Sequence, residues 1–273
     1  HPSQHVDPDL VQGVLAELIE RLDDNFPYFH PQYAGQMLKP PHPVAVAAYL
    51  ATMQLNPNNH SIDASRATTA MEHEVLDQLA AMFGYPADYM GHLTWSGTTA
   101  NLEALWVSRE IAPGKAIAHS ADAHYTHSRM GEVLGIDTVG IPTEADGRMS
   151  LDALERELAT GRIGVVVATL GTTGLGAVDP LAEIIPLARA HGARVHVDTA
   201  YGGFFSIIAD DLDAETARHF RAIKDADSVV VDPHKHGLQP YGCGAVLFTD
   251  QSILRFYHHE SPYTYFASTE RHF

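Results

Sequence analysis

Cysteine is almost absent from this chain: Cys243 is the only one among its 273 residues. A single cysteine excludes an intramolecular disulfide framework. Basic residues are also scarce, since 17 Lys and Arg stand against 34 Asp and Glu and give a formal net charge of -17. Such a balance repels a nucleic-acid backbone or an anionic membrane overall, so neither is expected as a partner. A small anion is still compatible with this charge, because a helix N-terminus binds it locally.

Long apolar runs are missing as well, and no stretch of the sequence is long and apolar enough to span a bilayer. The chain opens at His1 rather than Met, which predicts trimming, and no basic region followed by an apolar one indicates a secretory signal. Together with the lone cysteine, these features favour a reducing cytoplasm as the location. The hydrophobic fraction of 45% is ample for a buried core.

The first part of the chain has a helical pattern. Residues 8–24 carry apolar side chains at helical spacing and predict an amphipathic helix. Residues 25–43 are rich in Pro, aromatic residues and His, which favours an extended arm laid over another surface. Two more helices are expected, over about 43–53 and 68–83.

After residue 90 the pattern changes to short β-rich runs that alternate with amphipathic helices. The runs cover residues 116–118, 137–141, 163–170, 193–197, 228–231 and 245–248, with helices over 100–110, 150–159 and 180–191. This alternation predicts an α/β fold with a mainly parallel, doubly wound sheet flanked by helices. Because no internal repeat or low-complexity linker is visible, we divide the chain into an N-terminal helical arm, residues 1–60, and one large domain, residues 61–273.

Ligands of such sheets collect in loops at the C-terminal ends of strands, so the composition of those loops is informative. In the first loop, Ser96, Gly97 and Thr98 lead directly into a helix. Gly97 lets the backbone come close to a ligand, and the helix start offers unpaired N–H groups to an anion. An ordinary helix cap explains this loop equally well on local grounds.

A second loop begins with Asp198, at the end of an apolar strand. A buried carboxylate needs a partner to remain charged, and a cationic ring nitrogen would serve. Ala200 is small enough for a flat ring to lie against the backbone at this point. The alternative is a structural Asp whose carboxylate is satisfied by the following turn.

A third loop reads Asp232, Pro233, His234, Lys235 and His236 after another apolar strand. Burial and nearby positive charge would favour the neutral amine of Lys235 and make it a usable nucleophile. Taken in isolation, a lysine that reaches solvent from a loop is the more common explanation.

A fourth loop contains His124, which could stack on an aromatic ring, and His127, which we expect to be a surface residue. The competing interpretation is a metal site, because these two histidines have helical i, i+3 spacing and His234 and His236 follow later in the chain. We disfavour a metal, since the chain has no His-Glu-X-X-His pattern and only one cysteine.

The non-functional explanations of the anion loop, Asp198 and Lys235 are independent, so all three would have to hold at once for these features to have no shared role. Together they suit a phosphate, a pyridinium and an aldehyde. At this point the sequence resembles the group II pyridoxal 5′-phosphate (PLP)-dependent amino acid decarboxylases, the family of the aromatic-L-amino-acid, tyrosine and glutamate decarboxylases. The resemblance rests on four segments in the family's order, residues 123–125, 171–174, 196–203 and 232–235.

The resemblance implies the large domain of the PLP-dependent transferase fold type I. It implies that Lys235 holds PLP as a Schiff base and that Asp198 keeps the pyridine nitrogen protonated. His124 would stack on the ring, with Ala200 on its opposite face, and Thr172 would hydrogen-bond near the ring hydroxyl or the substrate carboxylate. The remaining cofactor-binding residues implied are Ser96, Gly97, Thr98, Asp232 and His234.

Family enzymes are homodimers with sites at the subunit interface, and an N-terminal arm wraps the partner, which residues 8–43 would suit. The segment around Tyr33 resembles one that lies near the substrate side chain. The main departure is length, because the family continues into a C-terminal small domain that this chain does not contain. Residues 261–266 resemble the approach to a mobile catalytic loop. The remainder is therefore expected to be a second polypeptide, to be cleaved away, or to be absent from the given sequence.

The expected function is PLP-dependent decarboxylation of an L-amino acid to the amine and CO2, with aromatic substrates favoured. Other PLP reactions on the same scaffold stay open, namely transamination, oxidative deamination and carbon–carbon lysis, because the bond that breaks is the one held perpendicular to the ring. A truncated, inactive binding domain is the non-enzymatic alternative.

Overall fold

The computed structural model describes residues 7–35, 37–59, 62 and 64–257. The chain forms two compact units, His1–Pro40 and Pro41–Phe273. The first contains α1 (Pro8–Leu22), where the Asp7 side chain accepts a hydrogen bond from the Asp9 N–H at 3.0 Å and Pro8 occupies the first turn. None of the α1 side chains is buried within this unit. The predicted division at residue 60 stays a prediction.

The second unit is built on a seven-stranded sheet with the order β1-β7-β6-β5-β4-β2-β3. The strands are β1 (Met90–Thr94), β2 (Ala116–Ser120), β3 (Thr138–Ile141), β4 (Ile163–Thr169), β5 (Arg194–Asp198), β6 (Ser228–Val231) and β7 (Gly244–Phe248). Strands β3, β2, β4, β5 and β6 run parallel to one another, whereas β7 is antiparallel to both β6 and β1. The prediction of an α/β fold with a mainly parallel sheet is confirmed.

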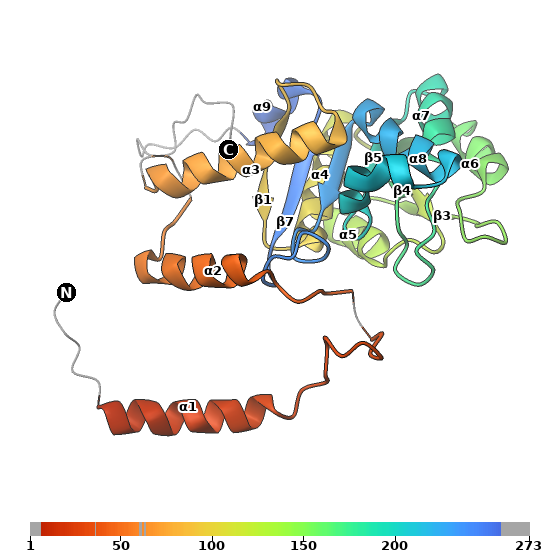
Figure 1. The fold of residues 1–273 in the computed structure, drawn as a ribbon. Coiled ribbons are helices and arrows are strands. Elements are labelled where there is room, and N and C mark those ends of the chain that lie inside the picture. The colour runs from red at the N-terminus through yellow and green to blue at the C-terminus, as the bar shows by residue number, and fades with distance from the viewer. Residues whose placement is uncertain (1–6, 36, 60–61, 63, 258–273) are drawn as a thin grey trace. The chain divides into compact units, whose positions relative to one another are not determined.

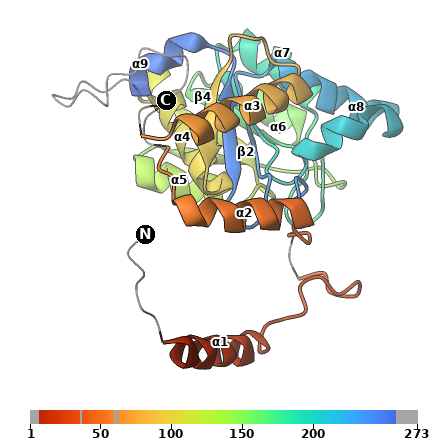
Figure 2. The same cartoon turned by 60° about the vertical axis from the view of Figure 1, so that its left-hand side comes forward.

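Helices cover both faces of this sheet (Figures 1 and 2). The helices of this unit are α2 (Pro43–Leu55), which buries no side chain, α3 (Arg66–Phe83), α4 (Gly97–Ile111), α5 (Thr126–Leu134), α6 (Leu151–Leu158), α7 (Leu181–Ala190), α8 (Ala214–Arg221) and α9 (Leu254–Tyr257). Short 3-10 segments are η1 (Gly203–Asp211), η2 (Ala222–Asp225) and η3 (Gln251–Ile253). None of the helices in the described part of the chain is both long and apolar enough to cross a membrane.

Alternate residues of β4, β6 and β7 enter different hydrophobic clusters, as the pleat requires. On one face, Val229 and Val231 pack in a core shared with α3, α6, α7 and α8. On the other face, Val230 packs with α4, and Val165 and Val167 pack with both α4 and α5. The central strands are therefore buried on both sides, and their polar ends are held rigidly where they leave the sheet.

The sequence pattern missed β1, α5 and α8 in this unit, as well as the short α9 and the 3-10 segments. The run of β1 begins Met90, Gly91 and His92, which lacks the branched apolar residues typical of a strand. It becomes a strand because it pairs along β7, from Met90 opposite Phe248 to Thr94 opposite Gly244. Such long-range pairing overrides the weak local preference.

Candidate active site

Asp198 is the last residue of β5 and is almost completely buried. Its Oδ1 accepts a hydrogen bond from the Ala200 N–H at 3.0 Å. Its Oδ2 lies 2.9 Å from Nε2 of His127 and 3.4 Å from Nδ2 of Asn101. Burial by itself would raise the pKa of Asp198, but the hydrogen bond and charge of His127 and the Ala200 N–H outweigh it and hold the pKa well below its ordinary value. The site therefore contains a buried carboxylate that remains ionised.

The prediction that His127 is a surface residue is wrong, because its side chain is fully buried. Its position on α5 explains this: the helical spacing puts His127 on the same side as Met130 and Gly131, which are also buried. The i, i+3 pattern of His127 and Met130 is the signal that could have indicated an inward-facing histidine. The prediction failed because the sequence pattern did not reveal α5.

Asn101 is a second buried residue to which the sequence assigned no role. It lies one turn into α4, and its Nδ2 donates to the Gly97 carbonyl at 2.8 Å as well as to Asp198. Its Oδ1 lies 2.8 Å from Nε2 of His196, whose Nδ1 lies 2.9 Å from the Ser228 hydroxyl. The surroundings of Asp198 thus extend as a polar network across two strands and a helix.

The predicted anion loop lies at the start of α4. Ser96 has extended backbone angles, and its Oγ accepts a hydrogen bond from the Thr99 N–H at 3.3 Å, so it does act as an N-cap. The Thr98 hydroxyl lies 3.2 Å from that of Thr126 and ties this loop to α5. The capping and anion-binding interpretations are compatible, because one cap leaves other N–H groups of the first turn available.

Gly97 brings this loop against the end of β6. A Cβ at Gly97 would lie 2.7 Å from both carboxylate oxygens of Asp232, so the close approach depends on the absence of a side chain. Asp232 is buried, and its Oδ2 forms an ion pair with Nζ of Lys235 at 3.1 Å. Its Oδ1 is buried without a hydrogen-bond partner. Burial raises the pKa of this carboxyl, and the charge of Lys235, which acts to lower the pKa, only partly offsets that effect.

Lys235 is held by its loop rather than extended into solvent. Its side chain is 19% exposed and lies over the buried Asp232. The loop is fixed by His234, whose Nδ1 lies 2.6 Å from the carbonyl oxygen and 3.2 Å from the backbone nitrogen of Cys243. The charge of Lys235 helps to lower the pKa values of both Asp198 and His124, so the three side chains share one electrostatic environment.

His124 and Ala200 flank the same region. Burial lowers the pKa of His124, Asp198 opposes this change, and Lys235 adds to it. The neutral imidazole is therefore favoured, which suits a ring-stacking role. Its ring centroid lies 4.3 Å from that of Tyr125, with an interplanar angle of 34°. Ala200 donates its N–H to Asp198 and has no side chain beyond Cβ to block a ligand there.

Thr172 is buried in the loop after β4, where its Oγ1 accepts a hydrogen bond from the Ala177 N–H at 3.0 Å. That bond leaves the hydroxyl proton of Thr172 available as a donor. The loop lies against the one after β5, because a Cβ at Gly202 would fall 2.0 Å from the Leu170 carbonyl oxygen.

Tyr33 belongs to the N-terminal unit, where it stacks with Phe26 at 6.0 Å and meets Tyr28 edge-on at 5.8 Å. Its predicted place at the substrate pocket stays a prediction. Residues 261–266, which resemble the approach to a mobile loop, lie outside the described residues.

The side chains at these strand ends fit PLP. The first turn of α4 and the Ser96 and Thr98 hydroxyls suit a phosphate, the ionised Asp198 suits a protonated ring nitrogen, and the Lys235 amine suits an aldehyde. A metal is a poorer fit: within residues 7–257, apart from the undescribed positions, no group of three or more His, Cys, Asp and Glu side chains could hold one.

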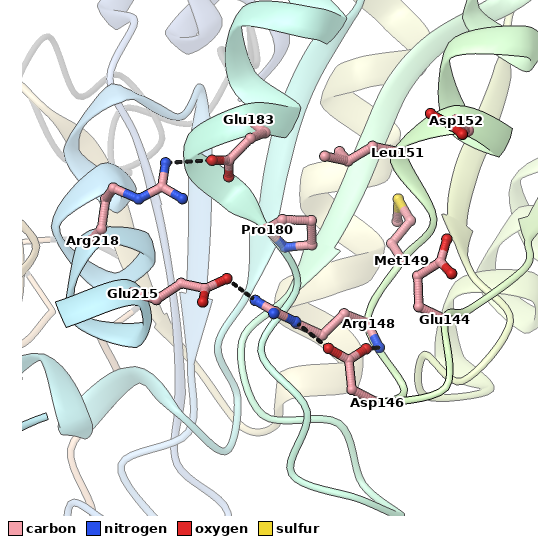
Figure 3. A pocket seen from close by; sticks show the side chains of 10 residues that line it. All are labelled: Glu144, Asp146, Arg148, Met149, Leu151, Asp152, Pro180, Glu183, Glu215 and Arg218. Carbon is pink, nitrogen blue, oxygen red and sulfur yellow. Dashed lines mark hydrogen bonds and ion pairs between the residues drawn. The ribbon is translucent and has the colours of Figure 1, made fainter. Parts of the chain in front are cut away.

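A different pocket, of about 360 Å³, lies between α6, α7 and α8 and the loop after β3, and Figure 3 shows its lining. None of the predicted site residues lines it. Arg148 is paired with Asp146 at 2.8 Å and with Glu215 at 2.7 Å, and Arg218 is paired with Glu183. Since both arginines are already neutralised, we assign this pocket no ligand.

Comparison with known proteins gives relatives of consistent type. The chain is 34% identical over 266 residues to the L-2,4-diaminobutyrate decarboxylase of Rhizobium meliloti, covering 90% of this chain and 52% of that protein. It is 30% identical to the L-aspartate decarboxylase of Thermococcus kodakarensis over 89% of this chain and 63% of the relative. The chain therefore spans between about half and two thirds of these curated relatives.

Solved structures agree with the sequence relatives. Mouse CSAD superposes with a TM-score of 0.80 at 26% identity, covering 95% of this chain and 60% of that structure. The glutamate decarboxylase domain of a diaminobutyrate-pyruvate transaminase and L-2,4-diaminobutyrate decarboxylase from Vibrio parahaemolyticus gives a TM-score of 0.82 at 26% identity, covering 98% of this chain and 62% of that one. The family model described as the pyridoxal-dependent decarboxylase conserved domain matches residues 8–263. The chain therefore belongs to the pyridoxal-dependent decarboxylase family, whose cofactor is PLP.

Proposed function

We propose that this chain carries the cofactor-binding part of an L-amino-acid decarboxylase, in which Lys235 binds PLP covalently and Asp198 pairs with its ring nitrogen. The observation that carries the proposal is geometric: Asp198 is buried at the end of β5, and Lys235 lies in the loop that follows β6, the strand paired with β5. A carboxylate kept charged in the interior calls for a cationic partner.

PLP, when bound, supplies an electron-poor ring that takes up the electron pair left as the Cα–carboxylate bond breaks. The residues of this chain contribute by keeping the ring nitrogen protonated and by holding the cofactor in position. Asp198 holds the proton on the ring nitrogen, the start of α4 holds the phosphate, and His124 covers one ring face. Ala200 leaves room on the other face, and Thr172 offers a hydroxyl proton to an acceptor near the ring.

Colour and mass provide the direct test. We expect the purified protein with added PLP to absorb visible light, and borohydride reduction to fix the cofactor on Lys235, as intact mass and peptide mapping would show. Lys235→Ala should lose both signals. Lys224→Ala, which removes an exposed lysine, is the matched control and should retain them. A wild-type protein that stays colourless and unmodified would favour the inactive binding domain.

Product analysis separates decarboxylation from the other PLP reactions. Decarboxylation yields one amine and one CO2 for each amino acid consumed. Transamination yields a keto acid, and aldehyde-forming oxidative deamination consumes O2 and releases CO2 and ammonia, so the amine is the product that distinguishes decarboxylation. Because the chain spans only part of its relatives, the assay should be run on this chain alone and together with any fragment that copurifies with it. Intact mass of the purified material identifies such a fragment as the possible second polypeptide.

The finer proposal is an aromatic substrate. It is supported by the aromatic group of Phe26, Tyr28 and Tyr33, on the segment that resembles a substrate-side element. The relatives are named for diaminobutyrate, aspartate and tyrosine, so their names cover basic, acidic and aromatic side chains. A panel of these amino acids tests the preference. A higher kcat/KM for aspartate or diaminobutyrate than for tyrosine would overturn it.

We further propose a cytoplasmic homodimer with the site at the subunit interface. The exposed apolar side chains of α1 and α2 support an assembly in which these helices are covered. Light scattering coupled to size exclusion should give twice the chain mass. A monomer that binds PLP fully would contradict this assembly without affecting the cofactor assignment.

A further inference from the structure

Four buried side chains, those of Ser228, His196, Asn101 and Asp198, form a continuous hydrogen-bonded chain that ends at the carboxylate proposed to pair with the ring nitrogen. The Ser228 hydroxyl on β6 lies 2.9 Å from Nδ1 of His196 on β5, and Nε2 of His196 lies 2.8 Å from Oδ1 of Asn101 on α4. Nδ2 of Asn101 then reaches both the Gly97 carbonyl at 2.8 Å and Oδ2 of Asp198 at 3.4 Å. A buried polar group that loses its hydrogen-bond partner destabilises the fold, so removing one member of this network should lower the free energy of unfolding.

The direction of each hydrogen bond follows from the two acceptors at its end. The Gly97 carbonyl and the Asp198 carboxylate only accept, so the NH2 group of Asn101 must face them and its oxygen must face His196. Nε2 of His196 therefore carries a proton. Burial lowers the pKa of His196 to about 3, which keeps the ring neutral. Its Nδ1 thus has no proton and accepts one from the Ser228 hydroxyl.

We propose that Asn101, oriented by His196 and Ser228, is a positioning residue that couples the phosphate-binding start of α4 to the carboxylate of Asp198. This inference rests on the proposed function. One amide spans the backbone of the anion loop and the partner of the ring nitrogen, which are the two ends of the PLP site. It also donates a second hydrogen bond to Oδ2, beside that of His127, and so favours the charged carboxylate.

Oδ1 of Asp198 accepts a hydrogen bond from the Ala200 N–H at 3.0 Å. A carboxylate oxygen accepts more than one hydrogen bond, so Oδ1 keeps capacity for the ring N–H. Asn101 and His127 hold Oδ2 from two different helices, α4 and α5. The carboxylate is therefore fixed on one oxygen and available on the other.

A purely structural explanation is that Asn101 only satisfies the Gly97 carbonyl within α4. Asn101→Ser separates the two roles. A serine hydroxyl can donate to the carbonyl four residues earlier, as Ser108 does to Ala104 at 2.8 Å in the same helix, but it is too short to reach both Asp198 and His196. Asn101→Ala removes both interactions. Ser108→Ala is the matched control, because it deletes a buried hydrogen bond of α4 remote from the site.

The test is the dissociation constant of PLP, measured by titrating the apoprotein and following visible absorbance. We expect Asn101→Ser to weaken binding about 10-fold or more, since hydrogen bonds to charged groups are the strong ones, and Ser108→Ala to leave it unchanged. In an Asp198→Asn background, Asn101→Ser should add little further loss. A structural role would weaken binding equally in both backgrounds.

Binding by Asn101→Ser within twofold of wild type would overturn the proposal, as would equal losses in the two backgrounds. If Asn101→Ala does not fold, Asn101→Ser and its double-mutant comparison still decide. A wild-type protein that takes up no PLP would instead contradict the proposed function. Nitrogen NMR of the apoprotein gives an independent readout: His196 should be protonated at Nε2, and a ring protonated at Nδ1 would contradict the assigned direction.

Discussion

Nε2 of His127 lies 2.9 Å from Oδ2 of Asp198, and the two side chains are 0% and 6% exposed. The pair joins the first turn of α5 to the end of β5, elements separated by 71 positions in the sequence. In the interior, a charged carboxylate costs several kcal/mol unless donors replace its hydration. His127 is the nearest of the donors that allow Asp198 to remain ionised.

The first prediction concerns this pair. His127→Leu should raise the pKa of Asp198, weaken PLP binding and lower the free energy of unfolding by about 1.5–3 kcal/mol, the value of a hydrogen bond to a charged group. His127→Gln, which can place an amide N–H near the position of Nε2, should recover most of the PLP affinity. Urea denaturation and PLP titration measure the two effects. Equal PLP affinity in the wild type and His127→Leu would show that the hydrogen bond from His127 to Asp198 does not contribute to PLP binding.

The second prediction concerns the charge of Asp198. Asp198→Asn should reduce the decarboxylation rate on the order of 10²–10³-fold, because a neutral amide does not hold a proton on the ring nitrogen. Covalent attachment of PLP to Lys235 should persist, as borohydride trapping and intact mass would show. Asp210→Asn, at a side chain that is 94% exposed, is the control and should leave the rate unchanged. A rate loss below threefold in Asp198→Asn would contradict the assigned role.

The third prediction tests the close approach at Gly97. A Cβ there would meet both carboxylate oxygens of Asp232 at 2.7 Å, so Gly97→Ala should force apart the start of α4 and the Lys235 loop. PLP affinity should fall about 10-fold or more, because overpacking by one methyl group costs about 1–3 kcal/mol. Gly140→Ala is the matched control, since a Cβ at Gly140 has no atom within 4 Å. Unchanged affinity in Gly97→Ala would show that the two loops are not a rigid part of the cofactor site.

The fourth prediction concerns Asp179, which is fully buried outside the cofactor site. Its two carboxylate oxygens accept the Met149 N–H at 2.7 Å and the Thr169 N–H at 2.8 Å, yet burial raises its pKa to about 6. The folded state therefore binds this proton more tightly than the unfolded state does. The stabilisation is complete below about pH 4 and is lost as the pH rises through about 6, by about 3 kcal/mol.

Asp179→Asn lacks this titration, so the informative quantity is the difference in unfolding free energy between the wild type and the variant. It should change in favour of the variant between about pH 4 and 6. The comparison is needed because His196, whose pKa is lowered to about 3, titrates over the same range with the opposite sign and is present in both proteins. A difference that changes in favour of the wild type would mean that the backbone N–H groups dominate and that the pKa is lowered.

Much of the α/β architecture could be predicted because its signals are local. The apolar run at 163–169 is too short for a helix and apolar at nearly every position, which is typical of a strand covered on both faces. By contrast, β1 has no such run and exists through its pairing with β7. Helix α5 was missed because its first turn, residues 126–129, contains no apolar residue to mark it.

The residues to which we assign direct chemical roles could be identified in the sequence because they lie at strand ends or at a helix start. Asp198, Ala200, Lys235 and the Ser96–Thr98 loop each combine an unusual side chain with an apolar strand or a helix start, and this combination can be read along the chain. Their partners could not be found in this way. Asn101 and His196 look like an ordinary helix residue and an ordinary strand residue, and only the hydrogen bonds between them reveal a network.

The sequence by itself determined where most of the strands and helices of the large unit lie and which strand ends carry an amine, a carboxylate and an anion loop, but not β1, α5 or α8. Only the tertiary structure decided that Asp232 is the ion-pair partner of Lys235 and that His127 and Asn101 both contact Asp198. The physical reason is range. Periodicity and capping act over a few neighbouring residues, whereas the order of β4, β5 and β6 and the faces of α4 and α5 bring together side chains from distant parts of the chain.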